Sequence, residues 1–188
     1  AKLSRTFRSV KNSNITEKTI KKYLGYLTDA FLTDKAIRYD VKGKKYIETP
    51  SKYYFTDIGI RNAQLNFRQQ EENHIMENIL YNELIARDFN IDVGVVEYNH
   101  LDENGKKVRS QLEVDFVVNK TDKRYYIQSA LTVANEEKRK QETNSLNRID
   151  DSYTKIVIVR DNILPWIDDK GVQYINIEDF LLERINLL

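Results

Sequence analysis

Two carboxylates alternate with apolar residues in the segment 113–118. At the two-residue period of a half-buried strand, Glu113 and Asp115 project from one face, and Val114, Phe116 and Val118 from the other. Carboxylate oxygens are the hard ligands that Mg²⁺ prefers, and a bound Mg²⁺ polarises a phosphate and activates water. The segment therefore predicts a candidate metal site.

Two more segments are expected to contribute side chains to this site. Residues 125–130 read as a second strand, joined to the first by the polar turn 119–124, with Tyr126, Gln128 and Ala130 on one face. Glu77 lies on a predicted helix from about residue 72 to 87. Glu77, Glu113 and Asp115 are thus the candidate metal ligands, and Gln128 adds a neutral carbonyl oxygen.

Composition excludes several other kinds of site. The 188 residues include no cysteine, so thiolate metal sites, disulfides and cysteine nucleophiles are excluded. His74 and His100 are too isolated to suggest a zinc site, and neither common glycine-rich nucleotide-binding motif occurs. No apolar run reaches the length of a membrane helix and no signal peptide opens the chain, so we expect a cytoplasmic protein without a membrane partner.

Charge divides the chain into two parts. Residues 1–62 hold 14 Lys and Arg against 6 Asp and Glu, whereas residues 63–188 hold 16 against 23. This asymmetry, with a polar segment at 66–73, predicts two modules, residues 1–66 and 67–188, of which the first meets a polyanion.

The first module has the outline of a winged helix-turn-helix. A short helix near residues 3–10 and the turn 12–14 precede a second helix that Asn14 or Thr16 can cap. A strand at 36–41, the basic turn 42–45, a return strand at 46–49, an interruption at Pro50 and a short strand at 52–55 follow. The second helix carries an apolar stripe that consists of Ile20, Tyr23, Leu24, Leu27, Ala30 and Phe31.

Lysines on this module are the candidate DNA contacts. In winged helices the second helix enters the major groove and the wing tip touches phosphate. The helix supplies three lysines and the wing three: Lys18, Lys21, Lys22, Lys42, Lys44 and Lys45. The same lysines also fit ordinary solvated charge, and winged helices also dock proteins.

The second module reads as an α/β sandwich. The helix at 72–87 is followed by strands at 92–98, 111–118 and 125–130, a charged helix at 135–147, a buried strand at 156–159 and a last helix at 177–188. The predicted fold class is α/β (α+β), with the winged helix-turn-helix followed by a domain with a small mixed sheet that resembles restriction endonucleases.

This order resembles the core of the PD-(D/E)xK nuclease-like fold. That fold places an Asp on one strand and an acid-x-Lys pair on the next. Asp115 matches the Asp, whereas Gln128 stands in place of the acid and Ala130 in place of the Lys. Glu77 matches an additional helical acid. The resemblance implies a nuclease-like module with a vestigial site at Asp115, Gln128 and Glu77.

Over nearly its whole length the chain also resembles the C-terminal region of predicted AAA-type ATPases of bacteria and archaea, a region that carries a domain of unknown function. The matching phrases are residues 23–32, 52–60, 77–84 and 113–116. The resemblance implies a preceding ATPase module with a phosphate-binding loop, which this chain lacks. We therefore interpret the chain as a C-terminal fragment.

Three functions follow from these observations. The favoured one is a non-catalytic, nuclease-like module that needs no cofactor, binds DNA or a protein partner and serves the missing ATPase. The second is a Mg²⁺- or Mn²⁺-dependent nuclease with an altered site. The third is a protein-interaction module without nucleic acid. The oligomeric state and any DNA preference stay open.

Overall fold

The computed structural model describes residues 5–7, 9, 14–68 and 71–184, and in them one mixed sheet of eight strands dominates the fold. The strands are β1 (Thr33–Asp40), β2 (Lys45–Phe55), β3 (Asn90–Leu101), β4 (Lys107–Lys120), β5 (Lys123–Ala130), β6 (Thr154–Val159), β7 (Trp166–Ile167) and β8 (Val172–Asn176). The helices are α2 (Glu17–Asp29), α3 (Ile58–Gln64), α4 (Glu72–Ala86), α5 (Glu136–Thr143), the 3-10 helix η1 (Leu146–Arg148) and α6 (Ile177–Leu181).

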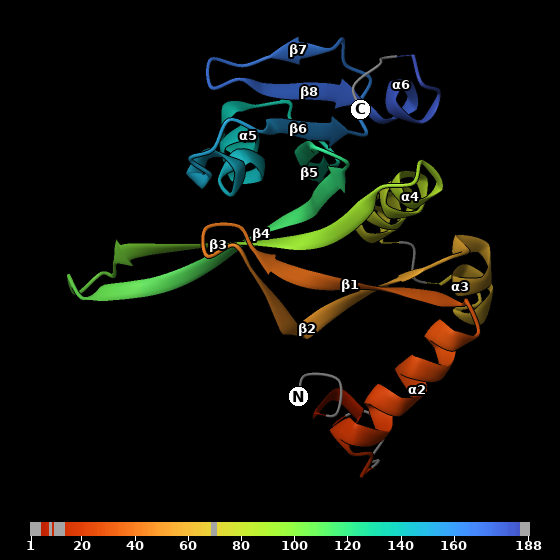
Figure 1. Cartoon of the computed structure of the whole chain (residues 1–188). Coiled ribbons are helices and arrows are strands. Elements are labelled where there is room, and N and C mark those ends of the chain that lie inside the picture. The colour runs from red at the N-terminus through yellow and green to blue at the C-terminus, as the bar shows by residue number, and fades with distance from the viewer. Residues whose placement is uncertain (1–4, 8, 10–13, 69–70, 185–188) are drawn as a thin grey trace.

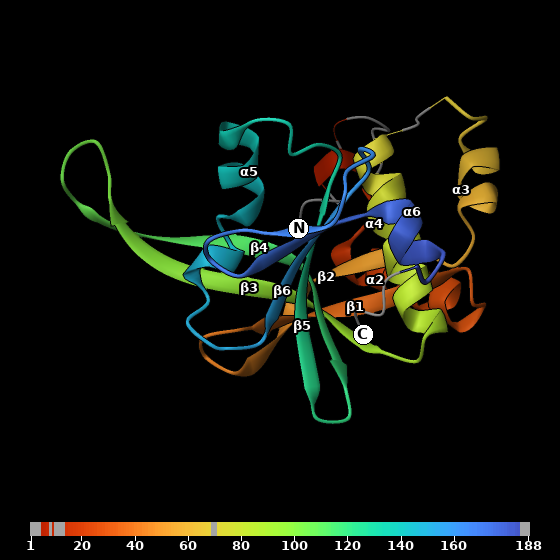
Figure 2. The same cartoon turned by 90° about the horizontal axis from the view of Figure 1, so that it is seen from above.

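The strands follow the spatial order β2-β1-β3-β4-β5-β6-β8-β7. The pairs β1–β3, β5–β6 and β6–β8 are parallel, and the other four pairs are antiparallel. Helices α4 and α6 lie on one face and α5 on the other, while the β3–β4 hairpin projects from the body as a long arm (Figures 1 and 2). The predicted α/β class is confirmed, but the mixed sheet is larger than expected.

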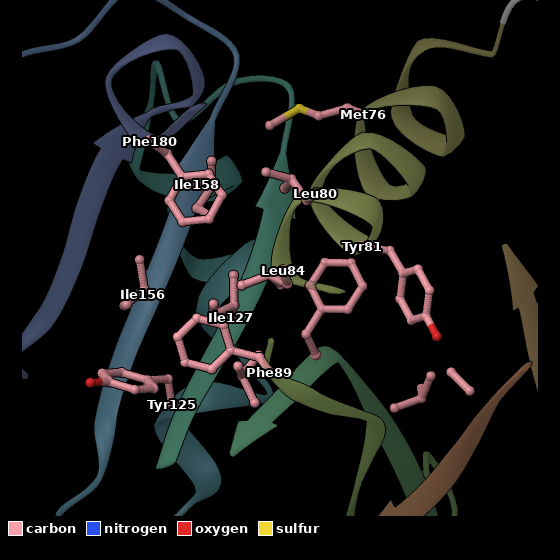
Figure 3. Close-up of a cluster of buried hydrophobic side chains, with 14 of the residues drawn as sticks. Met76, Leu80, Tyr81, Leu84, Phe89, Tyr125, Ile127, Ile156, Ile158 and Phe180 are labelled. Carbon is pink, nitrogen blue, oxygen red and sulfur yellow. The ribbon is translucent and has the colours of Figure 1, made fainter. Parts of the chain in front are cut away.

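The first core lies between the sheet and helices α4 and α6. Leu80 and Leu84 of α4 meet Ile127 and Ile158 of the central strands, and Phe180 of α6 closes the cluster (Figure 3). Phe116 of β4 belongs to the same cluster. Burial of such side chains contributes ~1.5–3 kcal/mol each. This packing fixes α4, and with it Glu77, against the sheet.

The second core fills the opposite face under α5 and η1. Leu146 and Ile149 pack against Val117, Tyr126 and Val157. The continuous apolar run of β6 is buried on both faces, because Ile156 and Ile158 face the first core and Val157 and Val159 the second.

A β-bulge in β4 changes the face on which one predicted residue lies. Asp92 pairs with Val117 and Gly94 with Val114, so Asp115 and Phe116 together oppose the single residue Val93. Val114 consequently lies in the second core, whereas Phe116 and Val118 lie in the first. The predicted regular alternation was therefore wrong at Val114.

Strand β2 runs through Pro50 without the predicted interruption. It is an edge strand, and its pairing with β1 shifts register between Ala36 and Arg38. Proline is tolerated where no ladder hydrogen bond is required, at edges and irregular pairings. The two predicted short strands are therefore one.

The β1–β2 hairpin belongs to the same sheet as the rest of the chain. Strand β1 pairs in parallel with β3 through Arg38–Val93, Tyr39–Gly94 and Asp40–Val95. The sheet therefore joins segments from both sides of the predicted boundary near residue 66.

Helix α2 forms where predicted, but its apolar stripe is mostly exposed. Thr16 caps the helix by accepting a hydrogen bond from the Thr19 amide. Ile20 is buried, whereas Tyr23 is 55% and Phe31 83% exposed. Of the predicted first helix, residues 5–7 and 9 are described and are helical, and the other residues lie outside the described part of the chain.

The last predicted helix is short. Helix α6 ends at Leu181, and residues 185–188 of the prediction lie outside the described residues. Among the helices that are described, none combines the length and the apolar character needed to cross a membrane.

Candidate functional site

Asp115 is buried at the bulge of β4, where the neighbouring strand holds it by backbone contacts. Its carboxylate oxygen Oδ2 accepts a hydrogen bond of 2.9 Å from the Ser129 amide. Its own amide donates to Oε1 of Gln128 at 3.4 Å. Asp115 and the β5 residues Gln128 and Ser129 are therefore linked by hydrogen bonds that each join a side chain to a backbone amide.

Lys52 of strand β2 lies among the three predicted acids. Its ammonium nitrogen Nζ is 2.7 Å from Oε1 of Glu77, 2.6 Å from Oε1 of Glu113 and 3.9 Å from Oδ1 of Asp115. Arg38 of β1 adds a second cation, 2.5 Å from the other oxygen of Glu113. The acids are brought together around an internal cation, and we call these five residues the Lys52 cluster.

Contacts between α4 and β2 hold Lys52 in place. Tyr54, two residues beyond Lys52 on the strand, donates its phenol hydrogen to the same Glu77 oxygen at 2.6 Å. Asn78 of α4 accepts from the Phe55 amide at 2.8 Å and donates to the Phe55 carbonyl at 2.7 Å. An edge strand and a helix are thereby fixed side by side through paired polar groups.

The cluster shifts the pKa of several of its groups. Burial, together with the charge of Glu77, raises the pKa of Asp115 to about 7, although Lys52 and the Ser129 amide oppose the shift. Burial alone would lower the pKa of Lys52, but the carboxylates of Glu77 and Asp115 raise it overall. Glu113 behaves oppositely to Asp115: burial raises its pKa, but the contact with Lys52 outweighs this and holds it below the usual range.

A polar cleft of about 340 Å³ opens beside the cluster. Glu77 and Asp115 form one part of its wall, and the end of β5 another. The end of β5 contributes Gln128, Ser129 and Ala130, and the rest of the lining comes from the first turn of α4, the segment after β5 and helix α5: Asn73, His74, Leu131, Thr132, Lys138 and Glu142. The predicted vestigial residues thus border an open space of small-ligand size.

The sequence did not identify Lys52 as a member of the site. Lys52 is 25 residues from Glu77 along the chain, and its partners come from other elements. The one local signal is the two-residue spacing of Lys52 and Tyr54, which puts a cation and a phenol on the same face of a strand. Ala130 is buried at the cleft wall, where a longer side chain is absent.

The predicted DNA-contacting lysines form two exposed groups away from the acids. Lys18, Lys21 and Lys22 lie on α2, and Lys22 lies over the Tyr26 ring at 5.6 Å. Lys42, Lys44 and Lys45 lie in and beside the β1–β2 turn, and all are exposed.

The acids of the Lys52 cluster are not arranged as a ready metal site. Among residues that the structure describes, no group of three or more His, Cys, Asp or Glu side chains is placed to hold a metal ion. The Lys52 ammonium lies where Glu77 and Glu113 converge, so their oxygens are bound to that cation.

Comparison with known proteins gives two similarities. The family model of a domain of unknown function, DUF8612, matches residues 4–71. An uncharacterized protein of Haemophilus influenzae is 32% identical over 185 residues, which are 97% of this chain and 41% of that relative. The chain therefore spans well under half the length of this relative. No solved structure matches the present chain.

Proposed function

We propose that this chain is a non-catalytic, restriction-nuclease-like module that binds DNA and serves an AAA-type ATPase. The observation that carries the proposal is the position of Lys52. Its ammonium contacts two carboxylates and lies near a third. Negative charge that would attract a divalent cation in a nuclease is largely neutralised by Lys52 and Arg38.

The arrangement around Asp115 supports the nuclease-like part of the proposal. An acid on β4, a polar residue on the antiparallel β5 and a helical acid border one cleft. Gln128 supplies no charge and Ala130 no ammonium. Loss of a transition-state donor typically costs about 10²–10³ in rate, which agrees with a module that retained its scaffold but not its chemistry.

The exposed lysines support the DNA-binding part. Two groups of three lysines stand on α2 and at the β1–β2 turn, in the part of the chain with excess positive charge. Lysine neutralises phosphate as a point charge without reading bases. We therefore propose phosphate-dominated binding with little sequence preference.

A titration of labelled duplex DNA with the full chain, in Mn²⁺ and at several salt concentrations, tests this function. We expect affinity to fall steeply with salt and the DNA to stay intact. Replacing Lys42, Lys44 and Lys45 by Gln should reduce the salt slope by about 0.9 for each phosphate that these lysines neutralise. Absence of binding at low salt would remove DNA and leave the protein-interaction module.

Three lysines elsewhere provide the control for charge alone. Lys106, Lys107 and Lys170 are exposed and lie at the tip of the β3–β4 arm or before β8. Their replacement by Gln removes the same net charge and should leave the salt slope unchanged. An equal loss of affinity in both triple variants would contradict a specific role for the β1–β2 turn.

A second candidate, a nuclease with an altered site, is favoured by the same lysine. Lys52, on strand β2, places its ammonium near Asp115. It could take the place of the lysine of the acid-x-Lys pair, whose position Ala130 occupies. This candidate predicts shortened DNA in Mn²⁺, with cleavage abolished in both Asp115→Ala and Lys52→Met. Exposed Lys35 on the adjacent strand β1 provides the control, because Lys35→Met should leave cleavage unchanged.

A further inference from the structure

Two exposed tyrosines lie at the border of the second core, on the opposite side of the sheet from the first core. Tyr46 at the start of β2 is 62% exposed, and Tyr153 just before β6 is 45% exposed. Each ring packs against a buried tyrosine of that core: Tyr46 against Tyr39, and Tyr153 against Tyr126. Aromatic rings that are held from one side but accessible to solvent provide a surface for stacking.

Arg124 connects the two tyrosine pairs. Its guanidinium carbon is 5.1 Å from the centre of the Tyr39 ring and 5.4 Å from that of Tyr153. The ring centres are 5.4 Å apart in the Tyr39–Tyr46 pair and 6.4 Å apart in the Tyr126–Tyr153 pair, both in edge-on geometry. We call Tyr39, Tyr46, Arg124, Tyr126 and Tyr153 the tyrosine–arginine surface.

The rings are positioned before any ligand arrives. The Tyr126 hydroxyl donates to Asp151 at 2.5 Å, and the amide of Tyr153 donates to the same carboxylate at 3.2 Å. Tyr46 lies beside Asp92, whose carboxylate raises the pKa of its phenol. Pre-positioned side chains lose little rotational freedom on binding.

Positive charge borders the surface on two sides. Lys44 and Lys45 directly precede Tyr46, and Lys123 directly precedes Arg124; all three are exposed. The β1–β2 turn and the β4–β5 turn that carry them lie along the lower side of the molecule in Figure 2. The carboxylates of Asp92 and Asp151 contact tyrosines, so the groups offered to a chain of phosphates are the ammonium groups of Lys44, Lys45 and Lys123 and the guanidinium of Arg124.

We propose that the tyrosine–arginine surface binds single-stranded nucleic acid, with bases stacked on Tyr46 and Tyr153 and phosphates beside Arg124 and the turn lysines. Alternating aromatic rings and cations are the common means of binding single strands without sequence preference, because every base has a face to stack. The inference rests on the proposed function for its class of ligand and shares Lys44 and Lys45 with it, but it names a single strand as the ligand and adds the rings of Tyr46 and Tyr153 as the stacking surface.

Anisotropy titrations of a labelled oligo-dT and of a labelled duplex, each with the full chain, test the proposal. Tyr46→Leu and Tyr153→Leu should each weaken oligo-dT binding about tenfold, within the range for loss of one stacked base. Tyr46→Phe keeps the ring and should keep the affinity. Arg124→Gln should reduce the single-strand salt slope by about 0.7.

Tyr23 is the matched control, because it is 55% exposed but lies on α2. Tyr23→Leu should leave oligo-dT binding unchanged, and thermal melting should show that all variants are folded. No oligo-dT binding at low salt, or an equal loss of affinity in the Tyr23 variant, would overturn the inference.

The two titrations separate the inference from the proposed function. Suppose that duplex binding depends on the turn lysines but oligo-dT binding does not change in the Tyr46 and Tyr153 variants. This result would overturn the proposal that the tyrosine–arginine surface binds single strands, and the proposed duplex-binding function would still hold. Oligo-dT binding that needs both tyrosines, without duplex binding, would support the surface and overturn the duplex-binding function.

Discussion

Single residues decide the electrostatic state of the Lys52 cluster. Glu77, Glu113 and Asp115 bring up to three negative charges into a half-buried space, and Lys52 and Arg38 bring two positive charges. The remaining imbalance is smallest when Asp115 is protonated, which agrees with its raised pKa. The net charge of the cluster therefore depends on both Lys52 and the protonation state of Asp115.

Replacing Asp115 by Asn should change how stability depends on pH. The pKa of about 7 in the folded protein lies above the ordinary aspartate value of 3.8, so the folded state binds this proton more tightly than the unfolded state. The contribution to stability is full below about pH 4 and is lost as the pH rises through about 7. Relative to Asp115→Asn, the wild type should therefore lose more than about 1.4 kcal/mol of unfolding free energy across this range.

Urea unfolding at pH 4.5 and pH 8 measures this difference, and Asn retains an acceptor for the Ser129 amide. Glu113 has the opposite sign, because its lowered pKa gives stability that is lost as the pH falls. Glu113 is present in both the wild type and Asp115→Asn, so its contribution cancels when the unfolding free energy of the variant is subtracted from that of the wild type at each pH. A difference between wild type and variant that stays constant with pH would contradict the raised pKa of Asp115.

At the scale of single elements, the bulge in β4 shows how one inserted residue redirects side chains. Asp115 and Phe116 share the space opposite Val93, so Val114 and Val117 both face the second core. Gly94 lies at this irregularity, and an added Cβ would be 2.8 Å from Cβ of Val114 and 2.9 Å from Cγ2 of Val117. The close approach of the strands there requires glycine.

Gly94→Ala should destabilise the protein by about 1–3 kcal/mol, because the added methyl overpacks the second core. Gly25 of α2 is the control, since a Cβ there meets no atom within 4 Å. Gly25→Ala should stabilise by about 0.5–1 kcal/mol through helix propensity. Chemical denaturation of both variants checks the pair, and equal effects would contradict the packing account.

The elements differ in how far the sequence could predict them. The apolar run of β6 and the alternation of β5 predicted strands correctly, because β6 is buried on both faces and successive side chains of β5 point to the two cores. Bulges depend on the partner strand, so Val114 was assigned to the wrong face. Lys52 was missed for a related reason: its role depends on α4 and β4, which are distant in the chain.

At the scale of the whole molecule, the sheet ties the first third of the chain to the centre. Strand β1 lies between β2 and β3, and the Val41 amide donates to the Val95 carbonyl at 3.0 Å. Removal of the hairpin would expose one edge of β3 and leave Glu77 and Glu113 without Lys52. The hairpin is therefore expected to unfold together with the rest of the sheet.

A single cooperative transition is the expected outcome of urea unfolding of the full chain. Trp166 lies at β7 and reports on the end of the sheet opposite to β2, whereas far-UV circular dichroism reports on all elements. The two midpoints should coincide, and hydrogen exchange should protect β1 and β6 with similar free energies. An early, separate transition of the hairpin would contradict this expectation.

The parallel pairing of β1 with β3 also governs the order of events during synthesis. Arg38 of β1 pairs with Val93 of β3, which is synthesised 55 residues later. The β1–β2 hairpin therefore leaves the ribosome before strand β3 has been synthesised. At roughly 5–20 residues per second this interval lasts about 3–11 s. During that time the free edge of β1 is open to pairing with other nascent chains, and a chaperone that shields it would improve the yield of folded protein.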